Sequence, residues 1–134
     1  MTQDEATLMF ANDAFYAAFV SADIDAMDAH WAKKNPVSCI HPGGPVLIDR
    51  TTIMDSWRAI LQAREAPQIT PYDATAMIIG EMGWVTCLEQ VGEAVAAATN
   101  IFVKEDGQWK MAHHQAGVTS ARPQSVGDRP KQTH

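Results

Sequence analysis

The chain has 134 residues, of which 46 % are hydrophobic and 19 % charged, and its formal net charge is −6. This balance is typical of a soluble protein with one core, and the acidic charge argues against nucleic acid as a partner, because phosphates require clustered Lys and Arg. No apolar stretch reaches the about 18 residues of a membrane-spanning helix, and the polar N-terminus does not resemble a signal peptide, so we expect a cytoplasmic protein without membrane contact.

The N-terminal half predicts helices. Apolar residues recur at helical spacing from residue 4 to residue 21, and acidic residues crowd the first turn, where the helix dipole favours them. Asp23 is a suitable N-cap for a second, shorter helix, and Thr52 begins a capping-box pattern for a third. The expected helices therefore span residues 4–21, 23–31 and 52–63.

The rest of the chain predicts strands, most of them in an antiparallel meander. Asp106-Gly107 is the strongest hairpin signal, because Asp-Gly accommodates the positive φ angles of a tight turn. The apolar stretch 37–41 runs into Pro42-Gly43-Gly44-Pro45, which predicts a loop. The expected strands span residues 37–41, 46–48, 73–79, 84–91, 94–104 and 109–118.

Helices followed by a meander predict an α+β domain over residues 1–120, with the helices on one face of the sheet. A strongly curved sheet of this kind leaves a cone-shaped space beneath the helices. Residues 121–134 contain too few apolar side chains to pack, so we expect a disordered tail there. Cys39 and Cys87 lie in apolar strand-like stretches and are expected to be buried, reduced and unreactive.

Several short motifs, in this order and spacing, carry a family resemblance. They are Ala-Asp-Ile-Asp-Ala-Met-Asp-Ala-His-Trp at 22–31, Ile-His-Pro-Gly-Gly at 40–44, Ser-Trp at 56–57, Thr-Asn-Ile-Phe at 99–102 and Asp-Gly-Gln-Trp-Lys-Met-Ala-His-His at 106–114. Over residues 4–118 the chain resembles the SnoaL-like branch of the nuclear transport factor 2-like superfamily. That superfamily includes ketosteroid isomerase, scytalone dehydratase, polyketide cyclases and the association domain of calcium/calmodulin-dependent kinase II, so the fold alone does not determine the function.

His41 is the first candidate for catalysis. It ends a strand just before Pro42, where its side chain would reach the mouth of the cone, and a His there is suited to be a general base near neutral pH. The resemblance places it where ketosteroid isomerase has its proton-shuttling Asp. The alternative is a His that only orders the following loop.

The resemblance to the isomerase itself is incomplete. Phe15 occupies the place of its oxyanion-binding Tyr, and Tyr16, about 100° further round the helix, should face elsewhere. No Asp stands on the strand 94–104, where the isomerase has a protonated partner. Without those donors an enolate lacks preorganised stabilisation, so steroid isomerisation is not expected.

His113 and His114 are neighbours on one strand, so their side chains should point to opposite faces. Because Lys110 belongs outside and Met111 inside, alternation assigns His113 and Gln115 to the pocket and His114 to solvent or a dimer partner. A two-residue turn at Asp106-Gly107 would set Asn100 opposite His113. A loop one residue longer would reverse that relation.

The other candidate pocket residues have two interpretations each. Glu89 is either solvated on the outer face or a buried carboxylate near His113, with its pKa raised by desolvation. Trp31 and Trp57 lie on buried helical stripes, where they either fill the core or, with Phe15, form the wall of a pocket for a flat ligand. No metal site is expected, because the His residues lack the spacing that would gather ligands on one face.

These observations predict a homodimer that pairs through the outer sheet face, with substrate-binding residues Trp31, Trp57, Asn100, Gln115, Glu89 and Phe15 and catalytic candidates His41 and His113. The expected function is to bind a small, mostly apolar organic molecule and, in an enzyme, to move a proton on it without a cofactor, as an isomerase, dehydratase or cyclase does. The alternative is a non-catalytic association module. A third possibility, a purely structural protein, follows if Trp31, Trp57 and Met111 fill the cone.

Overall fold

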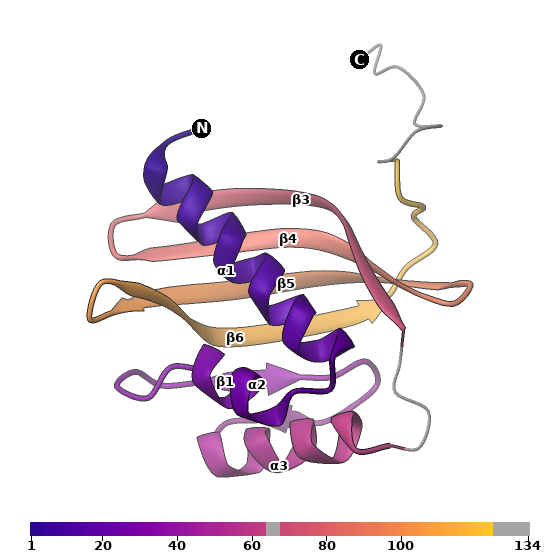
Figure 1. The fold of residues 1–134 in the computed structure, drawn as a ribbon. Helices are drawn as coiled ribbons and strands as arrows, with labels where there is room; N and C mark the ends of the chain where they lie inside the picture. The colour runs from indigo at the N-terminus through magenta and orange to yellow at the C-terminus, as the bar shows by residue number, and fades with distance from the viewer. Residues whose placement is uncertain (64–67, 125–134) are drawn as a thin grey trace.

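The computed structural model describes residues 1–63 and 68–124 (Figure 1). Residues 64–67 and 125–134, which include most of the expected tail, lie outside the described residues. Three helices and six strands follow one another: α1 (Gln3–Val20), α2 (Ile24–His30), β1 (Ser38–Ile40), β2 (Val46–Leu47), α3 (Arg50–Leu61), β3 (Ile69–Ile79), β4 (Met82–Val91), β5 (Ala94–Glu105) and β6 (Gln108–Val118). The predicted α+β class and the order of the elements are confirmed.

Side-chain caps explain where the helices begin. Thr2 caps α1 in a capping box with Glu5, and Asp23 accepts a hydrogen bond from the backbone N–H of Ala26 at the start of α2. The predicted start of α3 at Thr52 is wrong, because Asp49 caps this helix and accepts from the Thr52 N–H. The Thr52 side chain donates to the same Asp49 carboxylate and so belongs to the first turn rather than to the cap.

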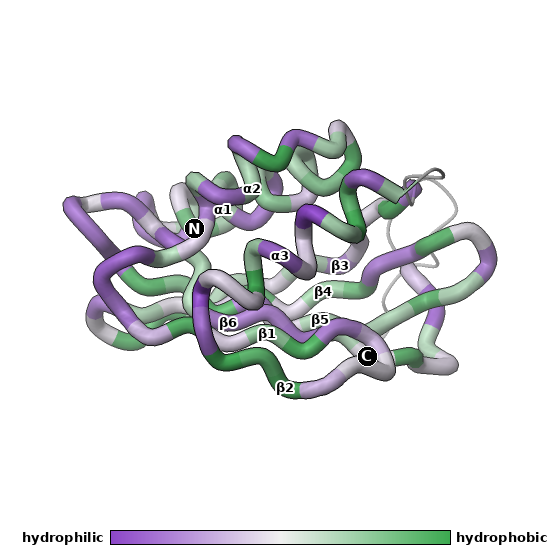
Figure 2. Tube along the Cα trace, turned by 90° about the horizontal axis from the view of Figure 1, so that it is seen from below, coloured by the Kyte–Doolittle hydropathy of each residue, from purple (hydrophilic) through white to green (hydrophobic). Residues whose placement is uncertain are grey.

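The six strands form one sheet in the order β2-β1-β6-β5-β4-β3. β1 runs parallel to β6, and every other neighbouring pair is antiparallel. Figure 2 shows all three helices on the same side of the sheet. Strand β3 begins earlier than the predicted residue 73 and includes Pro71, which is tolerated because β3 is an edge strand. No helix among the described residues is long and apolar enough to cross a membrane.

A tight turn and a β-bulge set the register of the last hairpin. Asp106 and Gly107 have φ angles of 53° and 78°, and Glu105 pairs with Gln108, so the predicted two-residue turn is confirmed. Further along, Phe102 pairs with Met111 while Ile101 pairs with His113, which leaves Ala112 as an extra residue in β6. Every β6 side chain after this bulge therefore lies on the face opposite to the one that simple alternation predicts.

The core lies between the concave face of the sheet and the helices, and its largest fully buried side chains include Trp31, Trp57, Phe15 and Phe102. Cys39 and Cys87 are both buried and free, as predicted. Burial raises the pKa of the Cys39 thiol to about 12 and that of Cys87 to about 11. Both groups are therefore protonated and poorly nucleophilic at neutral pH.

Candidate functional site

The bulge at Ala112 turns His114, not His113, into the core. His114 is 2 % exposed, so the predicted orientation toward solvent or a dimer partner is wrong. Asn100 pairs with His114 across the two strands, and the Asn100 Oδ1 lies 2.6 Å from the His114 Nδ1. Burial, with smaller contributions from His41 and His113, lowers the pKa of His114 to about 3. The imidazole inside the domain is therefore neutral.

Asn100 is the centre of a buried hydrogen-bond network. Its Nδ2 donates to the Asn12 Oδ1 at 2.9 Å and to the Tyr16 hydroxyl oxygen at 3.1 Å. With the amide in this orientation, Oδ1 is the acceptor for His114, so the proton of the neutral imidazole is on Nδ1 and the lone pair is on Nε2. The network thereby fixes which nitrogen of His114 can accept a proton.

Tyr16 and Glu89 extend this network toward β4. The prediction that Tyr16 faces away from the interior is wrong, because the residue is 2 % exposed and its hydroxyl lies 2.5 Å from the Glu89 Oε2 and 3.2 Å from the Cys87 Sγ. Glu89 is 4 % exposed, which agrees with the buried alternative, although its partner is Tyr16 rather than His113. Burial raises the pKa of Glu89, and the Tyr16 bond partly opposes this shift. Burial and the neighbouring Glu89 also raise the pKa of Tyr16.

His41 lies close to His114 and is more exposed than it. Its Nε2 lies 2.9 Å from the Ser56 Oγ, and that hydroxyl donates its own proton to the Ile53 carbonyl at 2.6 Å. Ser56 can then only accept from His41, so Nε2 carries the proton and Nδ1 the lone pair. Burial lowers the pKa of His41, so this imidazole is also neutral near pH 7. The next residues, 42–46, are all exposed.

Trp57 joins the two histidines into a cluster of aromatic rings. Its ring centroid lies 4.8 Å from that of His41, 5.7 Å from that of His114 and 5.5 Å from that of Phe15. Although Trp57 is fully buried, its Nε1 has no hydrogen-bond partner among the described residues. A buried N–H without a partner is costly, so it indicates a place for an acceptor that a ligand or water supplies.

The opposite end of the cone is filled. Trp31, Trp57 and Met111, the three side chains that the structural alternative places in a filled cone, are all fully buried, and Trp31 and Met111 also form an isolated backbone bridge with each other. The Trp31 Nε1 and the Asn12 Nδ2 also lack partners among the described residues. In this packing, space for a ligand at Trp57 has to open from the side of His41, where the surrounding loop is most exposed.

His113 and Gln115 lie on the outer sheet face instead of in the predicted pocket. His113 pairs with Ile101 and Ser38, and its Nδ1 lies 2.6 Å from the Ser38 Oγ. Gln115 is exposed and pairs with Thr99. Neither side chain can contact a molecule bound beside Trp57, so the bulge removes both from the candidate site. Among the described residues, no group of three or more His, Cys, Asp or Glu side chains could hold a metal ion.

The sequence analysis missed His114 and Tyr16, and only weak signals were available for either. Tyr16 belongs to a helix whose other buried residues are Leu8, Asn12, Phe15, Ala18 and Phe19, and it lies at the edge of the stripe that they form. The available hint was Asn12, a polar residue one helical turn before Tyr16, because residues at this spacing lie on the same side of a helix. The Ala112 bulge has no local signature comparable to the Asp-Gly turn.

Comparison with known proteins identifies the family. A model of the SnoaL-like domain matches residues 9–120. The chain belongs to this SnoaL-like domain family. A candidate dehydratase of the NTF2-like family from Streptomyces avermitilis is similar in structure, with a TM-score of 0.80, 29 % identity and coverage of 88 % of this chain and 97 % of that one.

Two further relatives of this SnoaL-like protein show how varied its neighbours are. A candidate calcium/calmodulin-dependent protein kinase type II association domain from Thiobacillus denitrificans has a TM-score of 0.72 and 28 % identity, covering 85 % of this chain and 96 % of that one. F-box protein SKIP8 from Arabidopsis thaliana is 24 % identical over 121 residues, which are 89 % of this chain and 52 % of the relative. The chain thus spans about half the length of this curated relative.

Proposed function

We propose that this SnoaL-like protein binds a small, mostly apolar organic molecule that carries a carbonyl group, at the His41 end of the cone. The observation that carries the proposal is the Trp57 Nε1–H, which is buried without a partner among the described residues, in a ring that packs near two neutral imidazoles. A carbonyl oxygen would accept this hydrogen bond, and the aromatic rings of Phe15 and Trp57 would contact the apolar body of the ligand.

The same geometry supports proton chemistry without a cofactor. With its Nε2–H held by Ser56, His41 would take a proton onto Nδ1 from the carbon next to the carbonyl, and the electron pair left behind would pass to the carbonyl oxygen beside the Trp57 N–H. His114 is a weaker base because its pKa is near 3. We therefore assign it the role of a neutral hydrogen-bond acceptor through Nε2. The similarity to a candidate dehydratase supports a reaction of this class.

The indole N–H resonances in a ¹H–¹⁵N correlation spectrum test the binding step. The four Trp residues report on different regions, and each signal can be assigned by a Trp→Phe substitution. Titration with small cyclic ketones should shift the Trp57 signal, and the Trp57→Phe variant should bind the same ketones about fivefold or more weakly because one hydrogen bond is lost. A Trp57 signal that no ketone moves would contradict the proposal.

Exchange of the α-protons of a bound ketone in D₂O tests the chemical step. Loss of the α-proton signal, followed by ¹H NMR, should be accelerated by the wild-type protein. It should slow by about a hundredfold in His41→Ala, the lower range for removal of a general base. His113→Ala is the matched control, because His113 lies on the outer sheet face. Equal exchange in both variants would exclude His41 as the base while leaving the binding proposal intact.

A second function, assembly of two copies, is favoured by a different observation. A row of outward side chains along the middle of β4 and β5 is uncharged and mostly apolar, and each of them is at least partly exposed: Trp84, Thr86, Leu88, Gln90, Ala97, Thr99, Ile101 and Val103. An apolar face of this kind indicates an interface. We propose a homodimer that pairs through this face, supported by the similarity to a candidate kinase association domain. Sedimentation equilibrium of the purified protein tests it, and a monomer at micromolar concentration would exclude it.

A further inference from the structure

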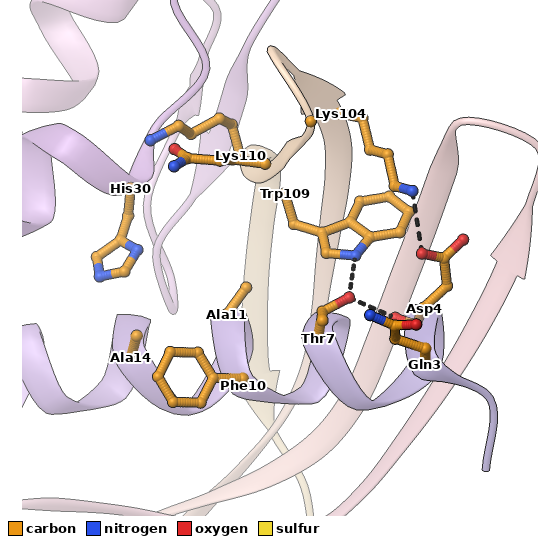
Figure 3. A pocket seen from close by; sticks show the side chains of 12 residues that line it. Gln3, Asp4, Thr7, Phe10, Ala11, Ala14, His30, Lys104, Trp109 and Lys110 are labelled. Carbon is orange, nitrogen blue, oxygen red and sulfur yellow. Dashed lines mark hydrogen bonds and ion pairs between the residues drawn. The ribbon is translucent and has the colours of Figure 1, made fainter.

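A separate hollow of about 460 Å³ lies on the outside of α1, between this helix, the end of α2 and the β5–β6 hairpin (Figure 3). On α1 it is lined by Thr7, Phe10, Ala11 and Ala14, whereas Leu8 and Phe15 of the same helix face the core. The helix therefore separates this hollow from the ring cluster around Trp57. Its volume is within the range of small-molecule sites.

Two aromatic side chains give the hollow an apolar surface. Phe10 is 74 % exposed, an unusual position for a large aromatic side chain on an otherwise polar helix surface. Trp109 is held in place, because its Nε1 donates to the Thr7 Oγ1 at 3.1 Å and the Lys104 Nζ lies 5.0 Å from its ring centroid. Figure 3 shows both rings among the side chains that surround the hollow.

The charges around the hollow are not balanced. Lys104 is neutralised by Asp4, with 3.0 Å between Nζ and Oδ1. The Lys110 Nζ donates to the Ala29 carbonyl at 2.8 Å, but no carboxylate among the described residues forms an ion pair with it. Its remaining N–H donors are available to an anion. His30 also lines the hollow. Burial and the nearby Lys110 lower the pKa of His30, so its imidazole is neutral.

We propose that this hollow binds a small amphiphilic anion, namely a carboxylate attached to a flat apolar body. The carboxylate would pair with Lys110, and the apolar body would lie between Phe10 and Trp109. Because the net charge of the chain is −6, its overall field does not attract anions. Any preference for the charged form of a ligand must therefore come from a local cation, which makes the Lys110 assignment testable.

The test compares two probes of the same shape, 3-phenylpropionate and its neutral amide, in a titration of the isotope-labelled protein. Only the Trp109 indole N–H should shift, and the carboxylate should bind about fivefold more tightly than the amide, the upper range for a partly exposed ion pair. In Lys110→Met, which keeps the aliphatic stem, the two probes should bind equally. In Phe10→Ala both should bind several-fold more weakly.

Lys33→Met is the matched control, since it removes the same charge from a side chain that does not line the hollow. It should leave the preference for the carboxylate unchanged. A Trp109 signal that neither probe saturates would overturn the proposal, as would an equal preference for the carboxylate in wild type and Lys110→Met. Movement of the Trp57 signal instead of Trp109 would place the probes in the cone and would also overturn it.

Discussion

Each face of the sheet departs from the usual antiparallel pattern: polar groups are buried among the apolar side chains of the concave face, and apolar side chains are exposed on the convex face. The concave face, buried beneath the helices, holds Glu89, Asn100 and His114, which are all less than 5 % exposed. The convex face presents uncharged and mostly apolar side chains to the outside, among them Trp84 and Ile101, which stand opposite each other on neighbouring strands. An ordinary two-faced sheet buries the apolar side chains and exposes the polar ones.

These departures suggest a different role for each face. Buried polar groups cost stability unless they are paired, and in the network of Asn12, Tyr16, Glu89, Asn100 and His114 the Asn12 Nδ2 has no partner among the described residues. A buried polar network of this kind is a candidate for a functional role. An apolar face that one copy leaves open favours a second copy. Ligand chemistry on the inner face and assembly on the outer face are therefore compatible in one molecule.

A charge on the outer face should have the largest effect. Ala97 is exposed on β5 between Leu88 and Gly117 of the adjacent strands. In Ala97→Glu, the proposed dimer would bring a desolvated carboxylate from each copy into the interface. We expect dimerisation to weaken by about a thousandfold, or about 4 kcal/mol, as measured by sedimentation equilibrium.

The same substitution at the end of the same strand is the control. Ala94 is exposed beside the β4–β5 turn, so Ala94→Glu should leave the dimer intact. Circular dichroism should show that both variants keep the fold of the wild-type protein. Equal dimerisation of the two variants would show that the convex face is not the interface.

Substitutions at two neighbouring residues of β5 compare the inner and outer faces of the sheet within a single copy of the protein. Asn100→Ala leaves the His114 Nδ1, the Tyr16 hydroxyl and the Asn12 Oδ1 without their partner, and it should lower the free energy of unfolding by about 3 kcal/mol or more. Thr99→Ala, on the outer face, should cost about 0.5 kcal/mol or less. Urea denaturation measures both, and equal losses would mean that the inner network contributes no more than an exposed hydroxyl.

The fold was predictable because its signals are local. Helical spacing in α1, the Asp23 cap and the Asp106-Gly107 turn each depend on residues a few positions apart, and they predict the elements in the correct order. The start of α3 was misplaced because Thr52 and Asp49 are both good caps, and the sequence does not show which of them has the extended backbone.

The candidate site was only partly predictable, because its geometry depends on contacts between distant segments. One extra residue at Ala112 exchanges His113 and His114, and that bulge exists where β6 must pair with β1 on one side and β5 on the other. Tyr16 was misplaced because adjacent residues of α1 contact different elements, so that Phe15 packs against Trp57 of α3 while Tyr16 reaches Glu89 of β4. Alternation and helical angle cannot predict either relation.

The pH dependence of stability also compares the two faces, because His114 is buried on the inner face and the adjacent His113 lies on the outer face. His114 has a pKa of about 3 in the folded protein against an ordinary value of 6.5, so below pH 6.5 the unfolded chain binds a proton that the folded chain does not. This contribution to stability is complete above pH 6.5 and falls by about 1.4 kcal/mol per pH unit toward pH 3. The free energy of unfolding should therefore lose about 2 kcal/mol between about pH 7 and about pH 5.

Variants separate His114 from the other titrating groups. His114→Gln should remove this loss, whereas His113→Gln should keep it. Glu89 acts in the opposite direction, since its raised pKa stabilises the protein at low pH and this contribution is lost as the pH rises above 4.5. It acts equally in both variants, so the difference between their urea denaturation curves isolates His114. A loss in His113→Gln as small as that in His114→Gln would contradict the assignment.

The smallest effect is expected for a hydrogen bond on the outer face, between Ser38 and His113. The Ser38 Oγ and the His113 Nδ1 are 2.6 Å apart and only partly buried, so water can replace either partner when the other is removed. Ser38→Ala should therefore lower the free energy of unfolding by about 0.5 kcal/mol, against about 2 kcal/mol for Tyr16→Phe, which leaves the buried Glu89 carboxyl without its donor. If Ser38→Ala instead costs as much as Tyr16→Phe, the outer face excludes water as strongly as the inner one. That result would be expected only if the second copy already covers His113 during the measurement, so repeating it at a protein concentration where the dimer dissociates would decide between the two explanations.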